Sequence, residues 1–188
     1  MEITFIGNCQ TASLCFYFQQ LLDPQHCNIS WTLYGNDFLQ YLGNWSEPIR
    51  NKIFNYDESI VAIKNSDIII FQEICINKSL FSNTETLNLL KKNSCKLIKI
   101  PSICMDYTNY DTSILELKKR EIQNNVNITV SDIFEKYKDK QLMVSLWHPN
   151  TFLFLEIVDE ICKLSNIETF SELKRKTFLQ DENYMKLP

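Results

Sequence analysis

Short apolar runs alternate with longer, helix-like segments along the chain. The first apolar run, 3–6, ends at Gly7, and an apolar-rich segment follows over 12–22. This order predicts a strand, a tight turn and a helix. Cys9 would lie in the first turn of that helix, where free backbone N–H groups and the helix dipole favour a thiolate. A buried structural cysteine is the alternative, since free cysteine is among the most buried residue types.

The same alternation of short apolar runs and longer, helix-like segments predicts the elements of the remaining chain. We expect strands at 29–34, 67–72 and 95–100, and loops at 35–48 and 102–111. Helices are expected within 49–65 and at 84–92, 112–123 and 131–137. A long amphipathic helix should follow with Pro149 at its first position, and a short helix after 168. The continuous apolar run at 67–72 is typical of a parallel strand buried on both faces. Alternating strands and helices predict an α/β fold of three layers, with a mostly parallel central sheet flanked by helices, in a single domain over 1–188.

Composition narrows the classes of partner. Hydrophobic residues make up 45% and charged residues 22% of the 188 positions, which is ordinary for a globular domain. The net charge of −4 predicts no binding of nucleic acid or of an anionic membrane surface. No apolar stretch reaches the roughly 18 residues of a membrane span, and Glu2 stands where a secretory signal needs basic residues.

Cysteine and histidine usage bears on compartment and on metal binding. The seven cysteines are odd in number and scattered through apolar segments, so we expect them to be reduced and the protein to be cytoplasmic. His26 and His148 are the two histidines, and no Cys-x-x-Cys pair occurs, so no metal site is expected.

Three separated residues are predicted to share one edge of the sheet. Cys9 follows the first strand, Gln72 ends a buried strand, and His148 precedes the last long helix. Ligands bind at the carboxyl ends of parallel strands, and a nucleophile, an amide donor and a base are the parts that acyl transfer needs. At a helix N-terminus, His148 would be favoured in its neutral form. The alternatives are that His148 only caps the helix and that Gln72 only bonds to the next loop.

These motifs resemble a known family over residues 1–164. The shared features are Gly7-Asn8-Cys9-Gln10, the run 67–72, the 101–111 loop and His148-Pro149-Asn150. They resemble the WcbI-type polysaccharide-biosynthesis family, acetyltransferases that bind coenzyme A. The resemblance implies an α/β core related to the SGNH hydrolases, with cysteine in place of the nucleophilic serine.

The resemblance also implies substrates and roles. Acetyl-CoA would be the donor and a sugar or glycan hydroxyl or amine the acceptor, in the biosynthesis of polysaccharide such as capsule. Cys9 would be the nucleophile with its N–H in the oxyanion hole, Gln72 a second donor to that hole, and His148 the base. The remaining motif residues, expected to contact the coenzyme, are Gly7, Asn8, Gln10 and Asn150.

One departure from the pattern concerns His148. The hydrolases carry an aspartate three residues before their histidine, where this chain has Ser145. A carboxylate that orients His148 would come from Asp106 or Asp111, or be absent. Cysteine tolerates this, because it needs less activation than serine.

Three rival hypotheses remain open. His148 alone could drive direct transfer, with Cys9 only lining the pocket. The same pair would equally serve an esterase or thioesterase that uses water, although aromatic-rich segments at 37–45 and 105–110 would suit a lid that excludes water and so favour transfer. The third hypothesis is a module without chemistry that holds a phosphate at the helix N-terminus after Gly7.

Overall fold

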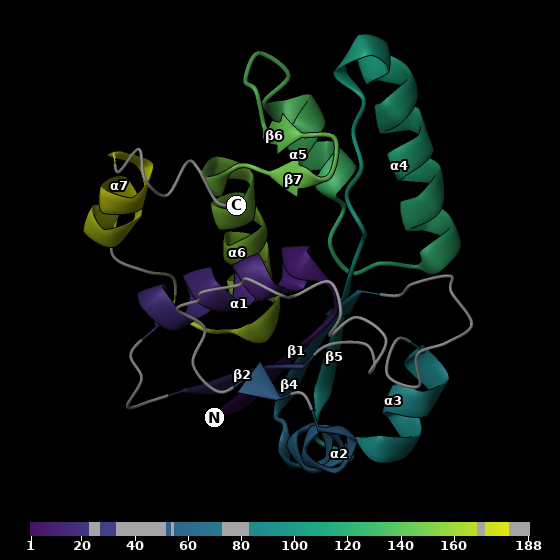
Figure 1. Cartoon of the computed structure of the whole chain (residues 1–188), viewed down its shortest axis with the longest axis vertical. Helices are drawn as coiled ribbons and strands as arrows, with labels where there is room; N and C mark the ends of the chain where they lie inside the picture. Colours follow the sequence, from purple (N-terminus) through teal and green to yellow (C-terminus); the bar gives the residue numbers. More distant parts are fainter. Residues whose placement is uncertain (23–26, 33–51, 54, 73–82, 169–171, 181–188) are drawn as a thin grey trace. The chain divides into compact units, whose positions relative to one another are not determined.

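The computed structural model describes residues 1–22, 27–32, 52–53, 55–72, 83–168 and 172–180. The chain divides into two compact units, Met1–Lys99 and Ile100–Pro188. Figure 1 labels the elements, and each unit is described separately below.

The first unit is a three-layer α/β structure. Its elements are β1 (Glu2–Ile6), α1 (Cys9–Leu21), β2 (Asn28–Thr32), β3 (Lys52–Ile53), α2 (Tyr56–Asn65), β4 (Ile68–Gln72), α3 (Thr84–Leu90) and β5 (Lys96–Ile100). The strands form one sheet in the order β3-β2-β1-β4-β5, and β1 pairs in parallel with both β2 and β4. Helix α1 lies on one face of this sheet and α2 and α3 on the other (Figure 1). The predicted fold class is confirmed.

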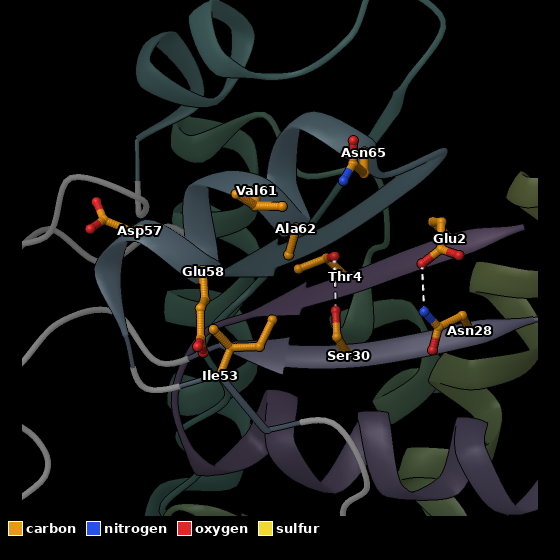
Figure 2. Close-up of a pocket in the computed structure, with 10 residues that line it drawn as sticks. All are labelled: Glu2, Thr4, Asn28, Ser30, Ile53, Asp57, Glu58, Val61, Ala62 and Asn65. Carbon is orange, nitrogen blue, oxygen red and sulfur yellow. Dashed lines mark hydrogen bonds between the residues drawn. The ribbon is translucent and has the colours of Figure 1, made fainter.

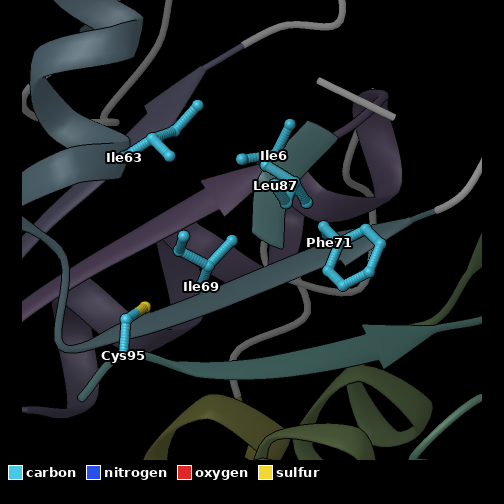
Figure 3. Packing of buried hydrophobic residues seen from close by; sticks show 6 residues of the cluster. All are labelled: Ile6, Ile63, Ile69, Phe71, Leu87 and Cys95. Atoms are coloured by element: carbon cyan, nitrogen blue, oxygen red, sulfur yellow. The ribbon is translucent and has the colours of Figure 1, made fainter. Parts of the chain in front are cut away.

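Alternating side chains of the strands supply a core to each face. On the α1 face, the rings of Phe5 and Phe18 meet edge to face with centroids 5.1 Å apart. The opposite face holds a cluster of buried side chains from β1, α2, β4, α3 and the residue just before β5 (Figure 3): Ile6, Ile63, Ile69, Phe71, Leu87 and Cys95. Every residue of β4 is buried, as expected for an inner strand covered by helices on both sides.

The order of the strands creates a switch point between β1 and β4. The chain runs from β1 outward through β2 to β3, and then crosses to β4 on the other side of β1. Ile6 pairs with Phe71, so Gly7 and Gln72 are the next residues at the carboxyl edge of these two strands. Ligands of open α/β sheets bind at such an edge.

The second unit consists mainly of helices that pack in chain order. It contains the 3-10 turn η2 (Tyr107–Asn109), α4 (Tyr110–Asn124), α5 (Val130–Lys136), the antiparallel hairpin β6 (Met143–Ser145) and β7 (His148–Pro149), α6 (Thr151–Ser165) and α7 (Glu172–Gln180). Contacts join α4 to α5, α5 to α6 and α6 to α7. Arg175 of α7 pairs with Glu156 and Asp159, which lie on α6.

Several predicted boundaries are wrong for local reasons. The helix predicted within 49–65 is confirmed as α2, which begins at Tyr56, where Asn55 caps it by accepting the Asp57 N–H at 2.8 Å, but the short strand at 52–53 was not predicted. The predicted loop at 102–111 contains η2 and the start of α4. Pro149 belongs to β7, and α6 begins at Thr151. The 35–48 loop and the 37–45 half of the predicted lid lie outside the described residues.

Candidate functional site

Cys9 is the first residue of α1, as the sequence predicts. The preceding residue, Asn8, is extended and caps the helix, with its Oδ1 accepting the Gln10 N–H at 2.9 Å. A helix leaves its first backbone N–H groups without intrahelical acceptors, so this turn supplies donors beside the Cys9 side chain. Cys9 itself is partly exposed.

Gly7 is required by the packing of this turn. A Cβ atom at Gly7 would lie 2.4 Å from Thr11 Oγ1 and 2.6 Å from Thr11 Cγ2. Thr11 is held in place because its hydroxyl donates to the Asn8 carbonyl at 2.8 Å and accepts from Trp31 Nε1 at 3.4 Å. Glycine at this position therefore lets α1 start directly against the end of β1.

The ionisation of Cys9 differs from the prediction. Burial raises the pKa of the Cys9 thiol above its ordinary value, and the backbone N–H groups of Gln10 and Cys9 lower it by less. The predicted thiolate at the helix N-terminus is therefore wrong, because desolvation of the charged form outweighs the helix. The thiol is protonated at neutral pH, and nucleophilic attack by it needs a base.

Gln10 and Gln72 meet at the switch point. Gln72 Nε2 donates to Gln10 Oε1 at 2.9 Å, and the two side chains are 0% and 3% exposed. The bond joins the end of β4 to the first turn of α1, next to Cys9. Complete burial suits a role for Gln72 in positioning this turn, whereas its role as an oxyanion donor stays a prediction.

His148 lies in the second unit, on the hairpin rather than at a helix end. Its side chain is exposed, and its Nδ1 is 2.6 Å from the Ser145 Oγ. The predicted place of His148 at the N-terminus of α6 is wrong, since two residues separate it from Thr151, the first residue of that helix. The approach of His148 to Cys9 stays a prediction.

Asn150, predicted to contact the coenzyme, is the N-cap of α6. Its Oδ1 accepts the Leu153 N–H at 2.9 Å and its Nδ2 donates to the Gln141 carbonyl at 2.5 Å. Both ends of the amide therefore hold the chain between the hairpin and α6 in place.

The two aspartates considered as partners of His148 have other surroundings. Asp106 Oδ1 accepts from the Thr108 hydroxyl at 2.7 Å and the Thr108 N–H at 2.9 Å, and these bonds lower the pKa of Asp106. Asp111 lies in the first turn of α4. The group that does bond to His148 is the hydroxyl of Ser145. Sequence reasoning noted Ser145 only as a departure, although a three-residue spacing across a two-residue turn could have indicated the contact.

A cavity of about 430 Å³ lies on the α2 face of the sheet (Figure 2). It is lined by residues of β1, β2, β3 and α2, among them Glu2, Asp57 and Glu58, and its described lining contains no lysine or arginine. Such a lining does not fit the phosphates of coenzyme A. On the cavity floor, Thr4 and Ser30 share a 3.0 Å hydrogen bond. Helix α1 covers the opposite face, so the cavity is not part of the Cys9 site.

The described residues contain no group of three or more His, Cys, Asp or Glu side chains that could hold a metal ion. Within the same part of the chain, no helix is long and apolar enough to cross a membrane.

Comparison with known proteins shows a similarity in fold to a solved structure. No protein-family model matches the chain, and no curated protein does. Among solved structures, the chain is similar to WcbI, with a TM-score of 0.64 and 12% sequence identity, over 100% of this chain and 72% of that one. WcbI is described as a novel polysaccharide biosynthesis enzyme, in a native form without a disulfide bond between coenzyme A and one of its cysteines. The likeness supports the α/β fold of the chain.

Proposed function

We propose that the protein is a WcbI-type acyltransferase that moves an acetyl group from acetyl-CoA to a hydroxyl or amine of a sugar. The observation that supports this best is the place of Cys9, a partly exposed thiol in the first turn of α1 at the switch point of a parallel sheet. The coenzyme and the polysaccharide context come from the fold likeness to WcbI and from the Gly7-Asn8-Cys9-Gln10 and His148-Pro149-Asn150 motifs.

In the first step, Cys9 attacks the thioester carbonyl. His148 removes the thiol proton, a bond forms between Cys9 Sγ and the carbonyl carbon, and the bond from that carbon to the coenzyme sulfur breaks. The proton passes from His148 to the departing sulfur, which leaves as coenzyme A thiol. Because one thioester replaces another, the free-energy change of this step is small. Because burial keeps Cys9 protonated at neutral pH, the base is essential to this step.

In the second step, the acceptor attacks acetyl-Cys9. His148 takes the proton of the sugar hydroxyl or amine, the new ester or amide bond forms, and the Cys9 sulfur leaves and regains that proton. The backbone N–H groups at the start of α1 stabilise the oxyanion in both steps. At Gly7 the predicted coenzyme contact is made by the backbone, because glycine has no side chain. At Asn8 and Gln10 the side-chain oxygens already accept hydrogen bonds from the Gln10 N–H and from Gln72.

A thioesterase using the same two residues is the second candidate. The observation that favours it is the exposure of His148 and Ser145, which leaves the base open to water. In that reaction water replaces the sugar in the second step, and the chemistry at Cys9 is unchanged.

Release of coenzyme A thiol from acetyl-CoA tests the proposal and separates the two reactions. A transferase releases the thiol slowly alone and at least about tenfold faster with the right sugar acceptor, whereas a thioesterase releases it at the same rate with or without sugar. Cys9→Ala and His148→Gln should both abolish release, and Cys104→Ala, which alters another partly exposed thiol, should not. No release under any condition would contradict both reactions.

A further inference from the structure

We propose that Ser145 is the positioning residue of His148. Its hydroxyl oxygen accepts the Nδ1–H of the neutral imidazole, so that Nε2 is left as the basic nitrogen. The catalytic consequence rests on the proposed function, but the arrangement of the proton on the ring can be tested without it.

The contact follows from the geometry of the hairpin. Ser145 and His148 are paired residues of the antiparallel strands β6 and β7, joined by the two-residue turn Leu146–Trp147. Side chains of directly opposed residues in such a pair lie on the same face and within reach of each other. The Oγ to Nδ1 distance of 2.6 Å is that of a short hydrogen bond.

Backbone bonds hold the hairpin in place from both sides. The Leu146 carbonyl, in the turn, accepts the Met105 N–H at 2.9 Å, and the Asn150 N–H donates to the Leu142 carbonyl at 2.9 Å. Met143 and Pro149, at the base of the hairpin, are both buried. The backbone that bears Ser145 and His148 is therefore fixed by its surroundings.

Two forms of the neutral ring can make this hydrogen bond, because the serine hydroxyl can either accept or donate. In neutral imidazole one nitrogen carries a proton and the other accepts, and the partner of one nitrogen decides which form is present. If Nδ1–H donates to Ser145, Nε2 has a free electron pair and is a base. If instead the Ser145 hydroxyl donates to Nδ1, the proton is on Nε2 and the basic nitrogen, Nδ1, is already bonded to Ser145. In the proposed form, with Nδ1–H donating, Ser145 takes the orienting role of a carboxylate without bringing a negative charge.

Nitrogen NMR of the imidazole rings tests this assignment directly. Spectra of the ¹⁵N-labelled protein at about pH 8.5, roughly two units above the usual pKa of imidazole, report the proton position on each neutral ring. The chain has only two histidines, so His26→Gln and His148→Gln assign both signals. We expect His148 to be protonated on Nδ1. Ser145→Ala should move the proton toward Nε2, Ser145→Thr should restore it to Nδ1, and Val144→Ala, at a neighbouring exposed position, should change nothing.

Two results would overturn the inference: a wild-type His148 protonated on Nε2, or a Ser145→Ala spectrum like that of the wild type. Because the readout is spectroscopic, it decides the role of Ser145 even if no acyl transfer is found. In the transfer assay, Ser145→Ala should lower kcat about tenfold with little change in KM for acetyl-CoA, and Ser145→Thr should recover most of it. If the tautomers are as predicted but no thiol is released, the proposed function is contradicted and the positioning role of Ser145 is retained.

Discussion

The side-chain amide of Gln72 donates a 2.9 Å hydrogen bond to Gln10 Oε1, which joins the end of β4 to the first turn of α1. Both side chains are buried, so neither can exchange its partner for water. A buried polar group that loses its partner retains the cost of its desolvation. The bond therefore links the stability of the sheet edge to the position of Cys9.

Gln72→Leu should destabilise the protein by about 1–3 kcal/mol, because Gln10 Oε1 loses its donor inside the core. Urea unfolding measures this change. The double variant Gln10→Leu with Gln72→Leu should cost less than the sum of the single variants, since each single change already removes the same hydrogen bond. Additive losses would show that the two side chains act independently.

Gly7→Ala should disturb the turn that leads into α1. The new methyl group would meet Thr11 Oγ1 at 2.4 Å, and relief of this clash should cost about 1–3 kcal/mol of stability. Thr11→Ala removes both of the closest atoms, so the double variant should regain part of the stability lost by Gly7→Ala. A Gly7→Ala protein with wild-type stability and wild-type Cys9 reactivity would contradict this account of the turn.

The pH dependence of Cys9 alkylation should reflect the raised pKa of its thiol. Alkylation requires the thiolate, so the rate at Cys9 should rise with pH later than the rate of N-acetylcysteine in the same buffer. Peptide mapping after timed exposure to iodoacetamide gives the rate at this residue. A midpoint at or below that of the model thiol would mean that the helix N-terminus outweighs burial after all.

Glu121 should make the stability of the protein fall as pH rises above the ordinary carboxyl range. This buried residue of α4 accepts the Ser131 N–H at 3.1 Å and bonds to the Ser131 hydroxyl, but burial raises the pKa of Glu121. Between the unfolded and folded pKa values, the native state holds a proton that the unfolded chain has lost. The stabilisation present below the unfolded pKa is therefore lost as pH rises through the folded one.

The variant Glu121→Gln isolates this effect, since it keeps an acceptor for the Ser131 N–H but does not titrate. Compared by urea unfolding from about pH 4 to 8, the wild type should lose stability relative to the variant, by about 1.4 kcal/mol per unit of pKa difference. Parallel stability profiles would show that Glu121 keeps its ordinary pKa in the folded protein.

The features that could be predicted from sequence are those that short segments define. The strand, turn and helix around Cys9 follow from a periodic apolar pattern and an asparagine cap, and β4 from its unbroken apolar run. The β6–β7 hairpin was missed because its strands are three and two residues long, too short to show a period of two. Its exposed turn residues, Leu146 and Trp147, also resemble a core segment in sequence.

Properties that depend on distant parts of the chain could not be predicted. Gln10 and Gln72 are 62 residues apart, and no local pattern indicates that they share a hydrogen bond. The pKa of Cys9 was expected to be low from its place on the helix, but it is set mainly by burial, which the whole fold determines. The bond between Ser145 and His148 likewise depends on the hairpin register.

The measurement that tests the central claim most directly is intact-mass analysis of the protein after incubation with acetyl-CoA in the absence of an acceptor. We predict an adduct of about 42 Da, one acetyl group in place of a hydrogen, mapped to Cys9, absent in Cys9→Ala and retained in Cys104→Ala. Addition of a competent sugar should remove it. An unmodified protein that still transfers acetyl groups, or an adduct on a different residue, would contradict the role of Cys9 as the nucleophile.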